Sequence, residues 1–122
     1  MIIHYECMKE NRIQYEIVAW FRNNYCLKIH NPRCIIFSVP NERSNTNELS
    51  RMMATGLLSG VSDLIVILPS RILFIECKNE TGKQQNTQID FMQSITSLGF
   101  EYHVVRSLKD FQTLINKVNN KL

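Results

Sequence analysis

The chain has 122 residues, of which 44% are hydrophobic and 20% are charged, and its 14 basic and 11 acidic side chains give a net charge of +3. This length fits one domain with a core of its own, so we expect a single domain over residues 1–122. No apolar run is long enough for a membrane-spanning helix and the first residues do not resemble a signal peptide, so we expect a cytoplasmic protein with no membrane partner.

The first predicted element is an amphipathic helix over residues 9 to about 27. Glu10 lies on its core-facing stripe, whereas Glu16 lies on the flank of that stripe, where a carboxylate is solvated. The pattern leaves two interpretations of Glu10 open, a functional carboxylate or a favourable charge near the helix N-terminus. The stripe itself consists of Ile13, Ile17, Trp20, Phe21 and Asn24.

The next predicted elements are a strand, a loop and a short helix. Residues 33–39 are nearly continuous in apolar side chains and predict a strand that ends at Pro40. The polar residues 41–47 predict a loop, and a short helix is predicted over residues 48–55.

The four cysteines form no C-x-x-C pair and are interpreted as reduced thiols. An alternative is a zinc site in which Cys26, His30 and Cys34 are joined by Cys7 or His4. The spacing matches none of the usual zinc patterns, and Cys34 opens an apolar strand, so the thiol interpretation is favoured.

A β-hairpin is the central predicted element. Residues 64–68 and 72–77 are almost uninterrupted branched and aromatic runs, and Pro69-Ser70 between them is a turn signal. If Pro69 and Ser70 alone form the loop, the antiparallel register follows by counting back from it. The predicted pairs are Leu68 with Arg71, Ile65 with Phe74, and Asp63 with Glu76.

The predicted register places Asp63 opposite Glu76, and strand alternation adds Lys78 to the same face. Directly opposed like charges destabilise a sheet, so a lysine, a proton or a metal ion is expected to neutralise the two carboxylates. Two interpretations follow, an ion-pair cluster at the end of the hairpin or a metal site. The spacing D-x(12)-E-x-K within two strands in mutual register favours the metal site.

After the hairpin, a turn over residues 79–83 leads into a predicted helix over residues 84–98, which Gly99 closes. Gln85 and Gln88 lie one helical turn before apolar residues of this helix and can face the sheet.

A fourth strand is predicted over residues 100–105, and a final helix begins at Ser107. The element order is therefore α, β, α, β, β, α, β, α. This order predicts an α/β domain with a small mixed β-sheet flanked by helices. The buried stripe of the final helix is Leu108, Phe111, Ile115 and Val118.

Asp63 and Glu76 are ligands of the kind that Mg²⁺ prefers, since this ion combines one or two carboxylates with water and phosphate oxygens. The backbone carbonyl of Cys77 and the carboxylate of Glu10 are further candidate ligands. Lys78 would orient an attacking water or contact a phosphate. Phosphodiester hydrolysis is the reaction that this set of groups suits best.

The pattern G-x-x-D, strand, turn, strand, E-x-K is similar to the PD-(D/E)xK nuclease superfamily, and the whole chain resembles a stand-alone VRR-NUC domain of the phage type. Ser62 stands where the family usually has proline, which shapes the turn into the strand and supplies no ligand. The matching segments are E-N-R-I-Q at residues 10–14, G-L-L-S-G-V-S-D-L-I at residues 56–65, F-I-E-C-K at residues 74–78, G-x(5)-Q at residues 82–88, and the closing strand at residues 100–107.

The resemblance implies a restriction-endonuclease-like fold and a Mg²⁺- or Mn²⁺-dependent endodeoxyribonuclease. In such an enzyme Glu10, Asp63 and Glu76 would bind the metal ion, Lys78 would assist the attacking water, and Gln88 would be an accessory active-site residue.

The resemblance also favours Glu10 over Glu16 as the acid of the first helix. Small stand-alone members are associated with homodimers that cut branched DNA such as Holliday junctions, in DNA repair and recombination. A phage-encoded member would act in the host cytoplasm. A domain of 122 residues carries one site, whereas symmetric cleavage of a junction needs two.

Arg43, Arg51 and Lys83 are the candidate DNA contacts, because the predicted loops place them near the carboxylate end of the hairpin. Taken singly, Arg43 and Arg51 are more readily interpreted as ordinary surface charges. Two other functions stay open: a nuclease-fold subunit that binds nucleic acid or has a structural role without cutting, and a nuclease for restriction or end trimming.

Overall fold

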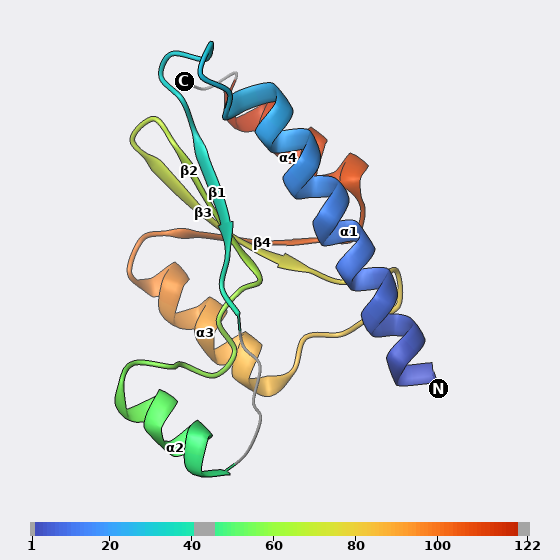
Figure 1. Cartoon of the computed structure of the whole chain (residues 1–122), viewed down its shortest axis with the longest axis vertical. Helices are drawn as coiled ribbons and strands as arrows, with labels where there is room; N and C mark the ends of the chain where they lie inside the picture. The colour runs from blue at the N-terminus through green and yellow to red at the C-terminus, as the bar shows by residue number, and fades with distance from the viewer. Residues whose placement is uncertain (1, 41–45, 120–122) are drawn as a thin grey trace.

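The computed structural model describes residues 2–40 and 46–119, and it includes the side chains of residues 8–40 and 47–119. The helices and strands follow the order predicted from the sequence (Figure 1). They are α1 (Ile2–Tyr25), β1 (Ile35–Ser38), α2 (Thr46–Ala54), β2 (Leu64–Leu68), β3 (Arg71–Cys77), α3 (Asn86–Ser97), β4 (Glu101–Val105) and α4 (Leu108–Asn119).

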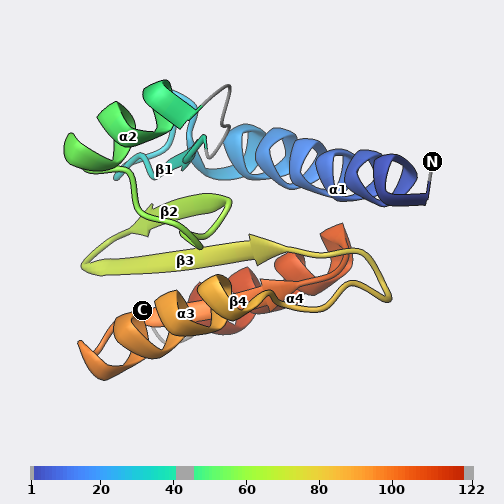
Figure 2. The same cartoon turned by 90° about the horizontal axis from the view of Figure 1, so that it is seen from below.

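The sheet is small and mixed, as predicted. Its strand order is β1-β2-β3-β4, with antiparallel pairing of β1 with β2 and of β2 with β3, and parallel pairing of β3 with β4. Figure 2 shows β3 running between α1 on one side and α3 on the other. The predicted α/β fold is therefore confirmed. None of the described helices combines the length and the hydropathy needed to cross a membrane.

Helix α1 begins at Ile2 rather than near residue 9. No glycine or proline interrupts residues 2–9, so nothing in the sequence stops the helix from extending backwards. The placement of Asn24 on the buried stripe is wrong. Its side chain is exposed, and its amide donates a hydrogen bond of 2.8 Å to the carbonyl oxygen of Trp20.

Strand β1 is shorter than the predicted strand over residues 33–39. The backbone N–H of Cys34 donates to the carbonyl oxygen of Tyr25 at 2.9 Å, so this residue belongs to the turn after α1 rather than to the sheet. Beyond the other end of β1, the N–H of Val39 donates to the carbonyl oxygen of Asp63 at 3.0 Å. This hydrogen bond holds the backbone of Asp63, just before β2 begins, against the segment that follows β1.

The β2–β3 hairpin has the predicted register. Leu68 lies opposite Arg71 and Ile65 lies opposite Phe74, so Pro69 and Ser70 alone form the loop. Ser70 adopts a left-handed backbone conformation with φ of 57°, which closes the turn.

The hydrophobic core lies between one face of the sheet and the helices α1 and α4. In β2 and β3 alternate side chains face this core, because successive side chains of a strand point to opposite faces. In Figure 1, α1 and α4 lie together, across the sheet from α3. The buried core residues of these elements are Ile17 and Phe21 of α1, Leu64, Val66 and Leu68 of β2, Leu73, Ile75 and Cys77 of β3, and Phe111, Ile115 and Val118 of α4.

Helix α3 covers the opposite face over β3 and β4 but not over β1. Phe74 of β3 packs edge to face against Phe91 of α3, with ring centroids 5.8 Å apart. On the uncovered part of this face Ile35 is 51% exposed, Phe37 41% and Ile72 36%. The sheet therefore keeps an apolar strip in contact with solvent.

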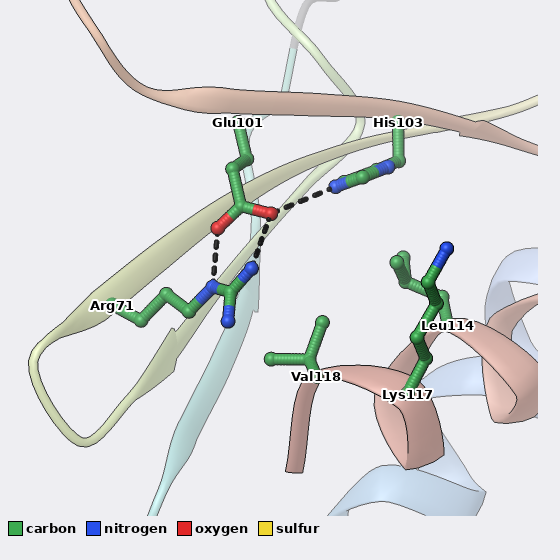
Figure 3. Close-up of a pocket in the computed structure, with 6 residues that line it drawn as sticks. All are labelled: Arg71, Glu101, His103, Leu114, Lys117 and Val118. Atoms are coloured by element: carbon green, nitrogen blue, oxygen red, sulfur yellow. Dashed lines mark hydrogen bonds and ion pairs between the residues drawn. The ribbon is translucent and has the colours of Figure 1, made fainter. Parts of the chain in front are cut away.

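An ion-pair network joins the start of β3 to the start of β4. Arg71 donates two hydrogen bonds to the carboxylate of Glu101, one of them at 2.8 Å, and His103 Nε2 lies 3.3 Å from the same carboxylate (Figure 3). The network borders a pocket of about 140 Å³ against α4, which is also lined by Leu114, Lys117 and Val118. Because the network ties the two strands at one end, it supports the parallel register that continues to the other end.

We expect Glu101→Gln to lower the free energy of unfolding at neutral pH by about 1 kcal/mol, the upper end for a partly exposed pair. The hydrogen bonds from Arg71 lower the pKa of Glu101 below its usual value of 4.5. Stability that comes from a lowered carboxyl pKa is present above the unfolded pKa and is lost as the pH falls through the folded pKa. The difference between wild type and variant should therefore shrink as the pH is lowered below 4.5, as measured by urea unfolding at neutral and at acidic pH. An equal difference at both would contradict the assignment.

Candidate active site

Asp63 and Glu76 meet at the end of β3, as the register predicts. Asp63 directly precedes β2, and its Oδ2 accepts a hydrogen bond of 2.8 Å from the backbone N–H of Cys77. Glu76 is only 1% exposed and lies on the face of the sheet that α3 covers. The two carboxyl groups are close enough to share a proton.

Burial, followed by the hydrogen bond with Asp63 and the negative charge of that residue, raises the pKa of Glu76 to about 9. A hydrogen bond from Tyr102 and the positive charge of Lys78 act in the opposite direction but do not cancel this effect. The pair therefore retains one proton at neutral pH unless a cation takes its place, because two adjacent like charges, one of them buried, do not both ionise.

Both oxygens of Glu76 are held by side-chain donors. The Tyr102 hydroxyl donates to Oε2 at 2.9 Å, and Gln88 Nε2 donates to Oε1 at 3.3 Å. Gln88 also accepts a hydrogen bond of 2.8 Å from the backbone N–H of Gln85 through its own Oε1, as part of the capping box of α3. The structure thus brings Gln88 to the site, as expected from the sequence, and adds Tyr102, which the sequence did not indicate.

Lys78 continues the same face of β3 and is 7% exposed. Its backbone N–H donates to the carbonyl oxygen of Val105 at 3.0 Å, which holds the end of β3 against β4. The aliphatic part of its side chain packs against Gly82, where a Cβ atom would lie 3.4 Å from Lys78 Cδ. Lys78 is thus nearly buried and its positive charge acts on Glu76, as predicted for this face of the hairpin end.

Glu10 reaches the same end of β3 from α1. Its Oε1 lies 3.2 Å from the position that a Cβ on Gly82 would occupy, and its charge contributes to raising the pKa of the Cys77 thiol. Glu16 instead pairs with Arg12 one turn away, at 3.2 Å. The structure therefore agrees with Glu10 as the acid of α1 that approaches the site.

The loop between β3 and α3 is held by Arg106, which follows β4. Its Nη1 donates to the carbonyl oxygens of Asn79 at 2.8 Å and Gly82 at 2.6 Å. The Asn79 side chain accepts from the N–H groups of Thr81 and Gly82 at 3.0 and 2.7 Å. This loop carries Lys83 at its exposed surface, close to the carboxylate end of the hairpin.

The two candidate arginines are not placed at the site by any contact. Arg43 lies outside the described residues. Arg51 is exposed in the last turn of α2, which packs against no other described helix or strand and stands apart in Figure 1. The alternative zinc site gains no support, because His30 Nδ1 accepts a hydrogen bond of 2.9 Å from the N–H of Leu27 and burial raises the pKa of the thiols of Cys26 and Cys34.

The donor set fits a hard divalent cation held by two carboxylates. Asp63 and Glu76 supply oxygen ligands, and the proximity of their two negative charges favours a cation between them. The backbone carbonyl of Cys77, the further candidate ligand, belongs to the last residue of β3 and directly follows Glu76. Among the side chains of residues 8–40 and 47–119, no group of three or more His, Cys, Asp or Glu is placed to hold a metal ion, so Glu10 approaches the pair without joining it.

A sequence profile of the VRR-NUC domain matches residues 8–109. The chain belongs to the VRR-NUC domain family. This is a family of nucleases, and the match spans the first helix, the hairpin and the closing strand that form the site described above. No match was found among curated proteins.

Two solved structures support the VRR-NUC fold. A chain titled "VRR_NUC domain protein" superposes with a TM-score of 0.70 at 19% identity, covering 89% of this chain and 86% of that chain. A chain titled "VRR_NUC domain" superposes with a TM-score of 0.60 at 26% identity, covering 88% of this chain and 95% of that chain.

This VRR-NUC domain departs from the usual family pattern at Ser62. The serine is fully buried, and its hydroxyl donates to the carbonyl oxygen of Leu64 at 3.4 Å. The hydrogen bond spans the turn into β2, the segment that proline shapes in the usual pattern. The position of Asp63 is therefore reached without the proline.

Proposed function

We propose that this VRR-NUC domain is a metal-dependent DNA endonuclease that hydrolyses phosphodiester bonds and acts selectively on branched DNA of the Holliday-junction type. The observation that supports it most strongly is the pairing of the buried Glu76 with the half-buried Asp63, on the face of the sheet that also carries the nearly buried Lys78. A buried like-charge pair costs stability, so a fold that retains it gains from a function that uses it.

Asp63 and Glu76 would hold Mg²⁺ or Mn²⁺. When bound, such an ion lowers the pKa of water and stabilises negative charge on a scissile phosphate. Lys78 offers its ammonium group on the same face, where it would orient the attacking water or contact the phosphate. Glu10 supplies further negative charge from α1, and Gln88 fixes one oxygen of Glu76.

DNA contacts are proposed at Lys83 and Arg51, with Arg43 as a third candidate. Lys83 lies on the loop that Arg106 fixes beside the site, so its exposed ammonium group is available to a phosphate next to the cleaved bond. Phosphate contacts of this kind give affinity that falls with salt but little base specificity.

Cleavage assays test this function directly. Labelled four-way junctions, flaps and linear duplexes of equal length would be incubated with the protein in Mg²⁺, in Mn²⁺ and in EDTA. We expect cleavage of the junction with either metal ion, slower cleavage of the linear duplex, and no cleavage in EDTA. Failure to cut any substrate with metal would refute the enzyme, whereas cleavage of linear ends alone would refute the selectivity for branched DNA.

We further propose that the domain works as a homodimer, since one site per chain must act on two strands of a junction. The uncovered sheet face suits a second copy. Every side chain that β1 places on it, and every one that β2 and β3 place there before Glu76, is apolar, so two copies meet without like charges. The same absence of positive charge makes this face unsuitable for DNA. The side chains of the uncovered part are Ile35, Phe37, Ile65, Ile67 and Ile72, whereas Phe74 is covered by Phe91 of α3.

Ile35→Ser is expected to shift the protein from dimer to monomer, because it places a hydroxyl at a position that is 51% exposed in the single chain and would be buried between copies. Light scattering across a dilution series measures the change. Ile29→Ser is the matched control, since Ile29 is 83% exposed and lies outside the sheet. A wild-type monomer, or equal effects of both substitutions, would contradict this interface.

A further inference from the structure

Tyr102 lies beside Glu76 without being one of the residues to which the proposed chemistry assigns a role. In the parallel pairing of β3 with β4, Tyr102 is level with Phe74 and Val104 is level with Glu76. The tyrosine therefore projects on the α3 side of the sheet, and its hydroxyl reaches Glu76 Oε2 at 2.9 Å. This contact joins β4 to the carboxylate that is least exposed to solvent in the site.

The direction of the hydrogen bond follows from a third residue. Gln84 Nε2 lies 3.5 Å from the Tyr102 hydroxyl oxygen and acts as a donor to it. The hydroxyl proton is thus left for Glu76. The ring is held as well, because it packs edge to face against Phe91 of α3 with centroids 6.1 Å apart. Both ends of the tyrosine are therefore fixed with its proton pointing at the carboxylate.

Glu76 is consequently held at both oxygens from two different elements. Tyr102 on β4 holds Oε2, and Gln88 on α3 holds Oε1. Each carboxylate oxygen has two lone pairs, so one hydrogen bond leaves each oxygen able to accept a further partner. A carboxylate fixed in this way cannot rotate about its last torsion without losing one of the two bonds.

We infer that Tyr102 is a positioning residue, which orients the Glu76 carboxylate so that its free lone pairs point towards Asp63. The inference rests on the proposed metal-dependent function. Outer hydrogen bonds to metal-binding side chains are generally worth about 10-fold to 100-fold in metal affinity or activity. A tyrosine with only a packing role would not affect metal affinity once the ring is retained.

The test is Tyr102→Phe, which removes the hydroxyl and retains the ring. Tyr25→Phe is the matched control, because the Tyr25 hydroxyl also accepts one side-chain hydrogen bond, from Asn119 at 2.8 Å, and its ring stacks on Phe21 in the core on the other face of the sheet. Mn²⁺ binding is measured by calorimetry on the whole chain without DNA, thermal unfolding is measured in EDTA, and junction cleavage supplies kcat and KM.

We expect Tyr102→Phe to bind Mn²⁺ about 10-fold more weakly than wild type and to lose kcat with little change in KM, while Tyr25→Phe binds Mn²⁺ like wild type. The two variants should unfold at similar temperatures. Equal Mn²⁺ affinity of Tyr102→Phe and wild type would overturn the positioning role and leave the proposed function standing. A wild-type protein that binds no Mn²⁺ would overturn both. If Tyr102→Phe is destabilised, a Mn²⁺ affinity that is unchanged below its unfolding temperature still overturns the positioning role.

Discussion

Glu76→Gln is expected to abolish junction cleavage, with a rate loss of about 100-fold or more, because a metal ion and its ligands supply several kcal/mol of charge stabilisation in phosphoryl chemistry. The substitution removes a negative charge and leaves the shape of the side chain. Glutamine still accepts a hydrogen bond from Tyr102 and still offers a donor to Asp63, but its amide nitrogen cannot accept the hydrogen bond that Gln88 donates to Glu76 Oε1.

The same variant should still fold in EDTA, with a loss of about 1 kcal/mol for the hydrogen bond from Gln88. Burial and Asp63 raise the pKa of Glu76 to about 9, so the metal-free carboxyl is protonated at neutral pH and glutamine reproduces that state. Urea unfolding in EDTA and Mn²⁺ binding therefore separate loss of the site from loss of the fold. Glu80→Gln, which alters an exposed carboxylate on the neighbouring loop, is the control. A Glu76→Gln protein that cuts at more than about a tenth of the wild-type rate would remove Glu76 from the catalytic site.

Gly60→Ala is expected to cost about 3 kcal/mol or more of unfolding free energy. A Cβ at Gly60 would lie 2.1 Å from the carbonyl oxygen of Thr87 and 2.9 Å from the backbone N of Gln88, both in the first turn of α3. Main-chain atoms there cannot move aside without displacing the helix, so the clash adds to the strain of a residue at φ of +83°. Displacement of α3 also withdraws Gln88 from Glu76, so the cleavage rate should fall together with stability.

Gly56→Ala separates the clash from the backbone strain. Gly56 has φ of +115°, but no atom lies within 4 Å of the position that its Cβ would take. This variant should lose only the cost of a strained backbone, about 1–2 kcal/mol, and should keep its cleavage activity. Urea unfolding of both variants measures the difference. Equal losses of unfolding free energy in the two variants would show that the clash with α3 adds nothing to the cost of the strained backbone.

Much of the site could be predicted because its parts are close together in the sequence. A two-residue loop leaves only one antiparallel register, and that register brings Asp63 opposite Glu76 across the hairpin. Strand alternation then determines the face on which Lys78 lies. The helical stripe of α1 likewise indicates that Glu10 points towards the core. No local pattern indicates that it approaches the loop at Gly82.

Other features could not be predicted, because they depend on packing between segments far apart in the chain. Nothing near Tyr102 indicates that its strand pairs in parallel with β3, and without that pairing its hydroxyl has no known partner. The exposure of Asn24 and of Phe37 depends on where the neighbouring elements end, and a helical or strand period does not specify this. The spacing of the apolar residues also predicts a start of α1 near residue 9, although the helix continues back to Ile2.

The sequence by itself determined the order of the helices and strands, the hairpin register and the meeting of Asp63, Glu76 and Lys78, since each follows from a local period or a short turn. Only the tertiary structure decided that β4 lies beside β3, that α3 and β4 both hold Glu76, and that Glu10 stops short of joining the carboxylate pair. These outcomes depend on long-range packing around a shared core, which brings together side chains that no local pattern relates.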